Sequence, residues 1–162
     1  MTKPHVAIAV FVAMILGGSF GIPTVLADNS RLNKGVVQNV YTLQRNEGCT
    51  DNLKINPQLQ LAAQWHANDA LTNRALDGDA GSDGSTPQNR ATAAGYQGKV
   101  SQTVAINPAL SITGMEILRQ WYHDPVDHAI MANCANTQIG VWSENRIDRT
   151  VVVAVYGQPA PQ

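Results

Sequence analysis

The C-terminal third of the chain carries the strongest constraint on the fold, a pair of neighbouring apolar segments with the character of β-strands. Residues 138–142 (QIGVW) and 150–156 (TVVVAVY) are separated by the polar stretch 143–149, which predicts an antiparallel hairpin. The second segment is apolar at successive positions, so both of its faces must be buried. A sheet containing this strand therefore needs a layer of helices on each side.

The preceding sequence supplies those helices. Apolar residues at helical spacing predict helices at residues 30–45, 56–76, 88–94 and 111–124, and a further strand is expected at 100–106. Asn56 and Pro57 are a capping residue and a first-turn proline, and Pro125 is expected to end the last helix. The predicted fold class is α+β, an α-β-α sandwich in which a small antiparallel sheet is covered by helices.

The N-terminus has the pattern of a secretory signal peptide over residues 1–27. Lys3 provides a positive charge, residues 6–16 are continuously apolar, and Val-Leu-Ala at 25–27 resembles a cleavage site. An uncleaved membrane anchor is the alternative, but Pro23 and two glycines interrupt the apolar segment before it reaches a spanning length. The expected product is secreted, to the extracellular space or the cell envelope, without a membrane span.

The remaining sequence, 28–162, is long enough for one domain and too short for two ordinary ones. Only the tail from about residue 158 is expected to be disordered. The whole chain has a formal net charge of −1 and 14% charged residues, so it lacks the basic surface that binding to nucleic acid requires. We therefore expect no nucleic-acid partner.

The chain has two cysteines, Cys49 and Cys134. Export favours an oxidised pair, so we expect one disulfide between them. Two cysteines without a nearby His-x-x-His or Cys-x-x-Cys motif do not make a structural zinc site. Neither cysteine lies in a Cys-His-Asn signature, which argues against a thiol nucleophile.

The loop LDGDAGSDGSTPQNR, at residues 76–90, raises the question of a cation or phosphate site. An EF-hand beginning at Asp79 would find glycine at its sixth position, Gly84, but its third position is Gly81 and its twelfth is Arg90. A phosphate-binding loop would need a lysine, and the three aspartates would repel phosphate. The residues alone leave this stretch as a surface loop.

The chain resembles the bacterial, SCP-like branch of the CAP superfamily, whose members include cysteine-rich secretory proteins, antigen 5 and pathogenesis-related proteins. The blocks that carry the resemblance, in chain order, are LKINPQLQLAAQWHANDAL, GSDGSTPQNRATAAGY, QWYHDP, TQIGVW and VVVAVYGQ. The resemblance implies an α-β-α sandwich. It also implies a cavity in which two histidines and a glutamate can hold a divalent cation.

This sequence departs from that ligand set at every position. The first histidine is replaced by Asp79, the glutamate by Gln102 and the second histidine by Asp127, with His128 one residue further on. These four residues are the candidate lining of a degenerate cavity. Since zinc prefers imidazole and thiolate ligands, we expect no cofactor and no metal site.

The resemblance leaves Asp83 and Arg90 as anchors of the loop, and His66 is interpreted as a hydrogen-bonded core residue. We find no Gly-x-Ser-x-Gly or His-Glu-x-x-His motif and assign no catalytic residue. The predicted function is extracellular binding of a lipid, a sterol, or an envelope or protein partner, without enzymatic activity. A metal-dependent hydrolase that uses the remnant cavity is the alternative.

Overall fold

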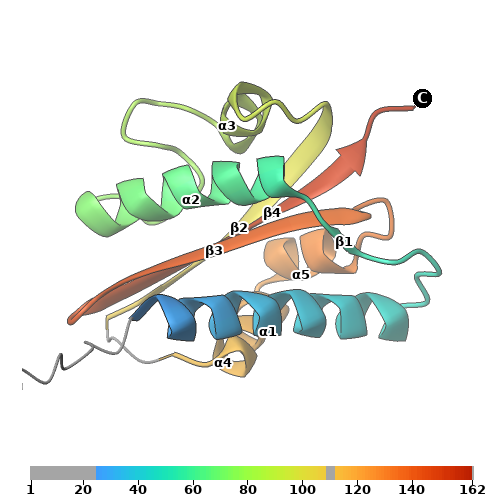
Figure 1. Ribbon diagram of the computed structural model, residues 1–162. Coiled ribbons are helices and arrows are strands. Elements are labelled where there is room, and N and C mark those ends of the chain that lie inside the picture. Colours follow the sequence, from blue (N-terminus) through green and yellow to red (C-terminus); the bar gives the residue numbers. More distant parts are fainter. Residues whose placement is uncertain (1–24, 109–111, 162) are drawn as a thin grey trace, which may run out of the picture.

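A computed structural model describes residues 25–108 and 112–161 of the chain (Figure 1). Its elements are α1 (Val25–Asn46), β1 (Lys54–Ile55), α2 (Pro57–Thr72), α3 (Pro87–Ala93), β2 (Gly98–Asn107), α4 (Gly114–His123), α5 (Pro125–Ala132), β3 (Gln138–Arg146) and β4 (Arg149–Pro159). Residues 1–24 of the predicted signal peptide lie outside the described residues. Among the described helices, none combines the length and the apolar character that a membrane span needs.

The four strands form one mixed sheet in the order β1-β3-β4-β2. The predicted hairpin is present, with β3 and β4 antiparallel and Trp142 opposite Val153. β2 pairs antiparallel with the other side of β4. At the opposite edge, β1 runs parallel to β3 and pairs only with Gln138 and Ile139.

Helices cover both faces of the sheet, as the apolar β4 segment requires. In Figure 1, α2 and α3 lie above the sheet, and α1, α4 and α5 lie below it. Val151, Val153 and Val155 belong to the core on the α2 side. Val152, Ala154 and Tyr156 belong to the core on the α1 side. Since successive side chains of a strand point to opposite faces, both faces of β4 are buried.

Helix boundaries follow from local capping. Asn56 accepts hydrogen bonds from the backbone N–H groups of Gln58 and Leu59 at the start of α2. Asp124 ends α4 and also accepts from the first N–H groups of α5. The Asp-Pro pair that was expected to end a helix therefore also begins the next one, because aspartate is a strong N-cap and proline suits the first turn.

Several elements differ from the sequence-based expectation; for example, β3 continues to Arg146, into the stretch expected to form the turn. α2 ends at Thr72 rather than near residue 76. β1 was not predicted, since two residues carry no periodic signal. Disorder was expected from about residue 158, but β4 extends to Pro159. Gln158 pairs with Lys99, and Pro159 pairs with Gly98. Backbone pairing with β2 outweighs the polar, proline-rich composition of this segment.

The predicted disulfide is present between Cys49 and Cys134, with a Cα–Cα distance of 5.2 Å. It ties the segment after α1 to the segment between α5 and β3. The two cysteines are 85 residues apart in sequence, so the bond closes a long loop. On the chain-entropy model such a closure stabilises the fold by roughly 4 kcal/mol.

Candidate functional site

The loop between α2 and α3 is held by polar contacts at several points. The backbone N–H of Ser82 donates to Asp69 on α2 at 2.7 Å. Asp83 accepts from the backbone N–H of Ser85 at 2.9 Å, and hydrogen bonds from Ser85 lower the pKa of Asp83. Gly84 has φ +78°, a left-handed conformation that glycine adopts without strain. The loop is therefore an ordered element that can position side chains.

Arg90, buried on α3, is the centre of the polar contacts that this loop makes. Its Nη1 donates to the carbonyl and the hydroxyl of Ser85 at 2.8 and 3.1 Å. Its Nη2 donates to the carbonyl of Asp79 at 2.8 Å and to Oε1 of Gln102 at 3.1 Å. Burial lowers the pKa of Arg90, and the nearby carboxylates of Asp79, Asp83 and Asp69 oppose that shift.

Gln102, on β2, connects Arg90 to the side chain of Asp79. Its Nε2 donates to Oδ1 of Asp79 at 3.0 Å. Asp79, Ser85, Arg90 and Gln102 thus share a network of hydrogen bonds, which we call the Arg90 cluster, although Nε of Arg90 is buried without a partner. Two of the four predicted cavity residues, Asp79 and Gln102, are brought together here.

Asp127, on α5, lies at the side of this cluster. Partial burial, then the carboxylates of Asp124 and Asp79, raise the pKa of Asp127 to about 6. The hydroxyl of Tyr156 lies 3.1 Å from that of Thr103. Burial raises the pKa of Tyr156, and the charge of Asp127 adds to the shift. Asp127 is therefore a carboxyl group whose pKa lies well above the ordinary value of 3.8.

His128 does not join the other three candidates. Its Nε2 lies 3.7 Å from Oε1 of Glu47, just beyond the end of α1. Its ring packs edge-on against Tyr122, with centroids 4.7 Å apart. One step along an α-helix rotates a side chain by about 100°, which separates the direction of His128 from that of Asp127.

His66 is fully buried on α2, and its Nε2 lies 2.7 Å from the carbonyl of Gly78. Burial lowers the pKa of His66, so the neutral ring donates from Nε2 to this carbonyl. Nδ1 is buried and has no hydrogen-bond partner. His66 therefore supports the start of the loop, which agrees with its interpretation as a core residue.

The residues of the cavity do not fit a zinc ion. The carboxylate of Asp79 accepts from Nε2 of Gln102, and Arg90 Nη2 donates to Oε1 of Gln102 and to the backbone carbonyl of Asp79. Within the described residues, no group of three or more His, Cys, Asp or Glu side chains could hold a metal ion.

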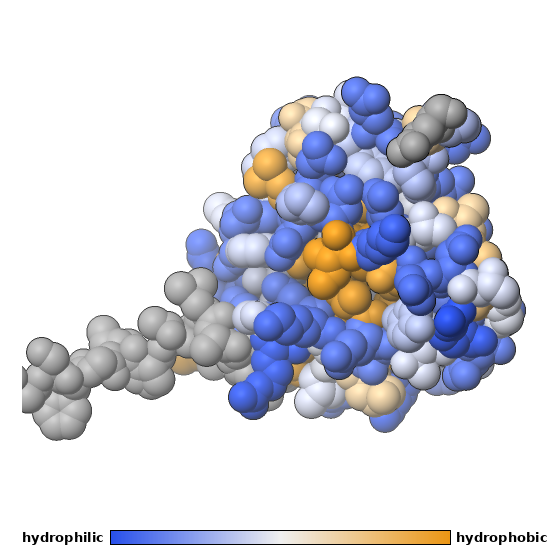
Figure 2. All heavy atoms as spheres, turned by 45° about the vertical axis from the view of Figure 1, so that its right-hand side comes forward, coloured by the Kyte–Doolittle hydropathy of each residue, from blue (hydrophilic) through white to orange (hydrophobic). Residues whose placement is uncertain are grey.

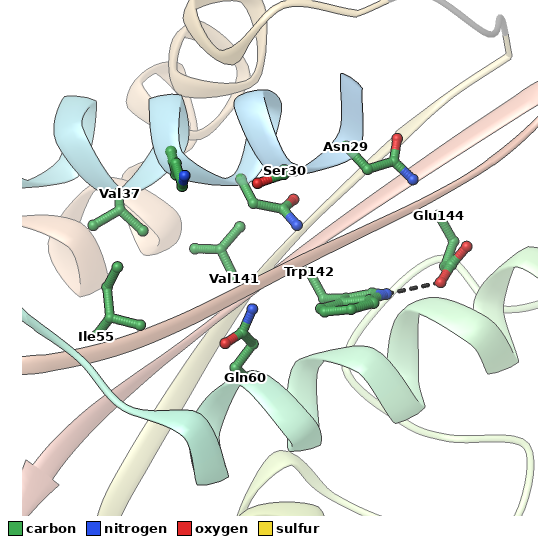
Figure 3. A pocket seen from close by; sticks show the side chains of 10 residues that line it. Asn29, Ser30, Val37, Ile55, Gln60, Val141, Trp142 and Glu144 are labelled. Atoms are coloured by element: carbon green, nitrogen blue, oxygen red, sulfur yellow. Dashed lines mark hydrogen bonds between the residues drawn. The ribbon is translucent and has the colours of Figure 1, made fainter. Parts of the chain in front are cut away.

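A second concave region was not predicted from the sequence. It lies along β3 between α1 and α2, has a volume of about 400 Å³, and we call it the edge groove. Its lining residues are Asn29, Ser30, Asn33, Lys34, Val37, Ile55, Gln60, Val141, Trp142 and Glu144. Figure 3 shows these side chains coming from α1 on one side and α2 on the other, with β3 crossing between them.

The edge groove combines apolar walls with a polar rim. Ile55 is 58% exposed although it is a large apolar residue. Trp142 is held in place by its indole Nε1, which donates to Oε1 of Glu144 at 2.8 Å (Figure 3). Figure 2 shows an apolar area surrounded by hydrophilic residues on the surface that contains the region between α1 and α2. A single tryptophan in a sequence gives no sign of the space beside it.

Comparison with known protein families shows which family the chain belongs to. The sequence model of the CAP, or cysteine-rich secretory protein, family matches residues 39–156. That segment includes the C-terminal part of α1, the whole loop between α2 and α3, and β4 as far as Tyr156. No protein with a curated description matches the chain.

Solved structures share the fold at low sequence identity. An outer surface protein from Borrelia burgdorferi has a TM-score of 0.67 and 18% identity, covering 78% of this chain and 92% of that one. An extracellular protein containing an SCP domain from Bacillus anthracis has a TM-score of 0.65 and 15% identity, covering 85% and 45%. A cysteine-rich secretory protein from Staphylococcus aureus has a TM-score of 0.62 and 12% identity, covering 80% and 39%. This chain thus spans less than half of the last two proteins.

Proposed function

Because this chain belongs to the CAP family of cysteine-rich secretory proteins, we propose that it is an extracellular protein that binds a partner and performs no chemistry of its own. The extracellular location is supported by the signal-like N-terminus and by the disulfide, a bond that persists in oxidising compartments. The printed descriptions of two structural neighbours, an outer surface protein and an extracellular protein, agree with it.

The observation that carries the binding proposal is the contrast between the two concave regions. The Arg90 cluster uses its polar atoms on one another, which leaves few of them to orient a substrate. The edge groove instead keeps apolar side chains accessible beside a rim of amides and one lysine, Lys34. Ligand sites in proteins typically combine apolar walls with a few polar groups in this way.

A metal-dependent hydrolase remains the second candidate because of one observation. Asp127 has a pKa of about 6 and lies near Asp79, and carboxyl groups that titrate near neutral pH are suited to acid–base catalysis. We nevertheless propose that the protein uses no cofactor, since Asp79 and Gln102 are bonded to each other and to Arg90.

Ligand analysis of the secreted protein tests the binding proposal. Native mass spectrometry and lipid extraction would be applied to the wild type and to Ser30→Trp, in which an exposed residue of the groove lining becomes bulky. Gln38→Trp, at an exposed position of α1 outside the lining, is the matched control. We expect bound lipid, or binding of an added partner, in the wild type and in Gln38→Trp but not in Ser30→Trp.

The hydrolase candidate makes a different prediction for the same preparations. Ester hydrolysis that depends on zinc and disappears in Asp127→Asn, but not in Ser30→Trp, would contradict the proposal and favour the enzyme. Absence of such hydrolysis together with ligand loss in Ser30→Trp would support binding at the edge groove.

A further inference from the structure

A further concave region lies between α2, α3 and the loop that joins them, and we call it the Trp65 pocket. Its lining includes Trp65 and Asp69 from α2, Ser82 and Asp83 from the loop, and Asn89 and Ala93 from α3. Its volume of about 480 Å³ lies within the range of about 300–1,000 Å³ that is usual for small-molecule sites. The pocket shares no lining residue with the edge groove.

The side chains that line the Trp65 pocket are accessible to solvent. Trp65 is 41% exposed although it is a large aromatic residue. Asp83, Asn89 and Ala93 are exposed as well. Trp65 and Asp69 are four residues apart on α2, which places them on one side of that helix, and Asn89 and Ala93 have the same spacing on α3. A ligand can therefore contact both the indole ring and the polar groups from the solvent side.

The polar groups of the pocket can make hydrogen bonds beyond those within the protein. Asp69 accepts from the backbone N–H of Ser82, and Asp83 accepts from the backbone N–H of Ser85. A carboxylate has about four acceptor positions, so each of the two can also accept from a ligand. Asn89 uses its Oδ1 in the cap of α3, which leaves its Nδ2 as the group that can donate to a ligand.

The charges around the pocket select among classes of ligand. The carboxylates of Asp69 and Asp83 repel an anion, and an acyl chain would have to displace water from both of them. A cation gains less than two carboxylates would suggest, because the Arg90 guanidinium lines the same pocket and already attracts them. A neutral ligand with hydroxyl groups, which both donate and accept hydrogen bonds, fits all of these groups.

We propose that the Trp65 pocket binds a neutral carbohydrate. The C–H face of a sugar ring packs on the indole of Trp65, which offers a large and rigid contact surface. Hydroxyl groups of the sugar donate to Asp69 and Asp83, and Nδ2 of Asn89 donates to a hydroxyl oxygen. This inference goes beyond the proposed function, because both the site and the class of ligand differ from those of the edge groove.

A glycan array tests the proposal without assuming one sugar. The secreted wild type, Trp65→Ala and Leu61→Ala would be applied to neutral, anionic and cationic glycans after a check for unchanged melting temperature. Leu61 is the matched control, because it is an exposed apolar residue one turn before Trp65 and lies outside the lining. We expect neutral glycans to bind the wild type and Leu61→Ala, and to bind Trp65→Ala about tenfold more weakly or less, because the stacking surface is lost.

Three outcomes of the array would overturn the proposal. These are no glycan binding by the wild type, a preference of the wild type for anionic or cationic glycans, and an equal loss of binding in Trp65→Ala and Leu61→Ala.

A glycan found on the array then tests the hydroxyl contacts. Asp69→Asn keeps an oxygen that can accept from the backbone N–H of Ser82 but removes the charge and half of the acceptor positions. We expect it to weaken glycan binding about tenfold, as the loss of a hydrogen bond to a charged group implies. Asp77→Asn, at an exposed position outside the lining, should have little effect. Equal affinities of the two variants would contradict the assigned contact.

A variant that fills the pocket from the other helix gives a second measure of its role. Ala93→Trp places a bulky side chain in the lining without removing a polar group, and Gln38→Trp on α1 is the control outside it. We expect glycan binding to be lost in Ala93→Trp and retained in Gln38→Trp and in Ser30→Trp. Loss in Ser30→Trp with retention in Ala93→Trp would place the glycan in the edge groove and overturn the inference.

Tetramethylammonium is the probe for the competing class of ligand, an organic cation over the face of Trp65. Neutral-glycan binding should change little as the salt concentration rises, whereas cation binding should weaken because salt screens the carboxylates. Tetramethylammonium binding that is lost in Trp65→Ala, together with no glycan binding, would show that the pocket binds cations and that the inference is wrong. The binding proposed for the edge groove would stand in that case, because Ser30→Trp tests it separately.

Discussion

The Arg90 cluster and the edge groove lie on the same sheet and differ in how their polar groups are used. In the Arg90 cluster, a buried guanidinium meets two carbonyls and two side chains, and the hydrogen bonds close on themselves. In the edge groove, the backbone of β3 extends past the end of β1, and apolar side chains remain accessible. Polar groups that are bonded to one another stabilise the fold, whereas a groove with accessible apolar side chains can bind a partner.

Gly140→Ala should produce the largest effect, because it forces α2 away from the groove. A Cβ at this position would lie 2.0 Å from the N atom of Gln60 and 2.2 Å from the carbonyl carbon of Leu59. These are backbone atoms of a packed helix and cannot move independently. We expect a loss of about 3 kcal/mol or more in the free energy of unfolding, measured by urea denaturation.

The glycine prediction separates the two regions. Amide exchange in the loop between α2 and α3 should change less than exchange at the start of α2. Gly35→Ala is the control, since a Cβ there meets nothing within 4 Å, and alanine favours a helix. A Gly140→Ala protein with wild-type stability would contradict the tight packing of α2 on β3.

Arg90→Ala should come next, at about 3 kcal/mol, because it leaves several buried acceptors without a donor. The control is Arg74→Ala, which removes an exposed ion pair with Asp148 and should cost less than about 1 kcal/mol. Amide exchange should rise over residues 78–85 in Arg90→Ala. If ligand binding at the edge groove were lost along with the loop, the two regions would not be independent.

Sequence patterns predicted the family, the α-β-α layers and the disulfide, and the structure and the family match confirm them. These features depend on local signals: the doubly apolar β4, the caps of α2, and a single pair of cysteines. The motif block around Asp83 and Arg90 also located the loop that Arg90 contacts through Asp79 and Ser85.

The direction of His128 and the edge groove depend on contacts between distant segments, which sequence patterns do not show. The direction of His128 follows from how α5 begins at Asp124, and its contact with Glu47 joins segments far apart in the chain. The edge groove exists because β1 stops after Ile55, and so short a strand has no periodicity. Neither an exposed Ile55 nor Trp142 indicates a concave surface until the helices are placed around β3.

Asp127→Asn should have a smaller effect, which depends on pH. The pKa of Asp127 is about 6 in the folded chain, above its ordinary value of 3.8. The folded state therefore binds more protons than the unfolded state between about pH 4 and 6, and stability falls as the pH rises through this window.

Replacement by asparagine removes that dependence, so Asp127→Asn should be more stable than the wild type at pH 7. We expect the free energy of unfolding to rise by about 1 kcal/mol. This is less than the full pKa shift of Asp127 implies, because solvent screens a half-buried group and the start of α5 favours a negative charge. Thermal unfolding of both proteins from pH 4 to 8 measures it, with Asp77→Asn as an exposed control. A wild type that gains stability from pH 4 to 6 relative to Asp127→Asn would reverse the sign.

The smallest expected effect is that of zinc on the wild type. Calorimetry should detect binding no tighter than that of an ordinary cluster of exposed carboxylates, because Asp79 and Gln102 are bonded to each other and His128 contacts Glu47. The double variant Asp79→His, Gln102→Glu supplies an imidazole and a carboxylate, ligands that zinc accepts, and should bind zinc more tightly than either single variant, since ligands act together. Tight zinc binding by the wild type that His128→Ala abolishes would show that the region around the Arg90 cluster opens to receive a cation. The contrast between a closed cluster and an open groove would then fail, and the hydrolase would become the leading candidate.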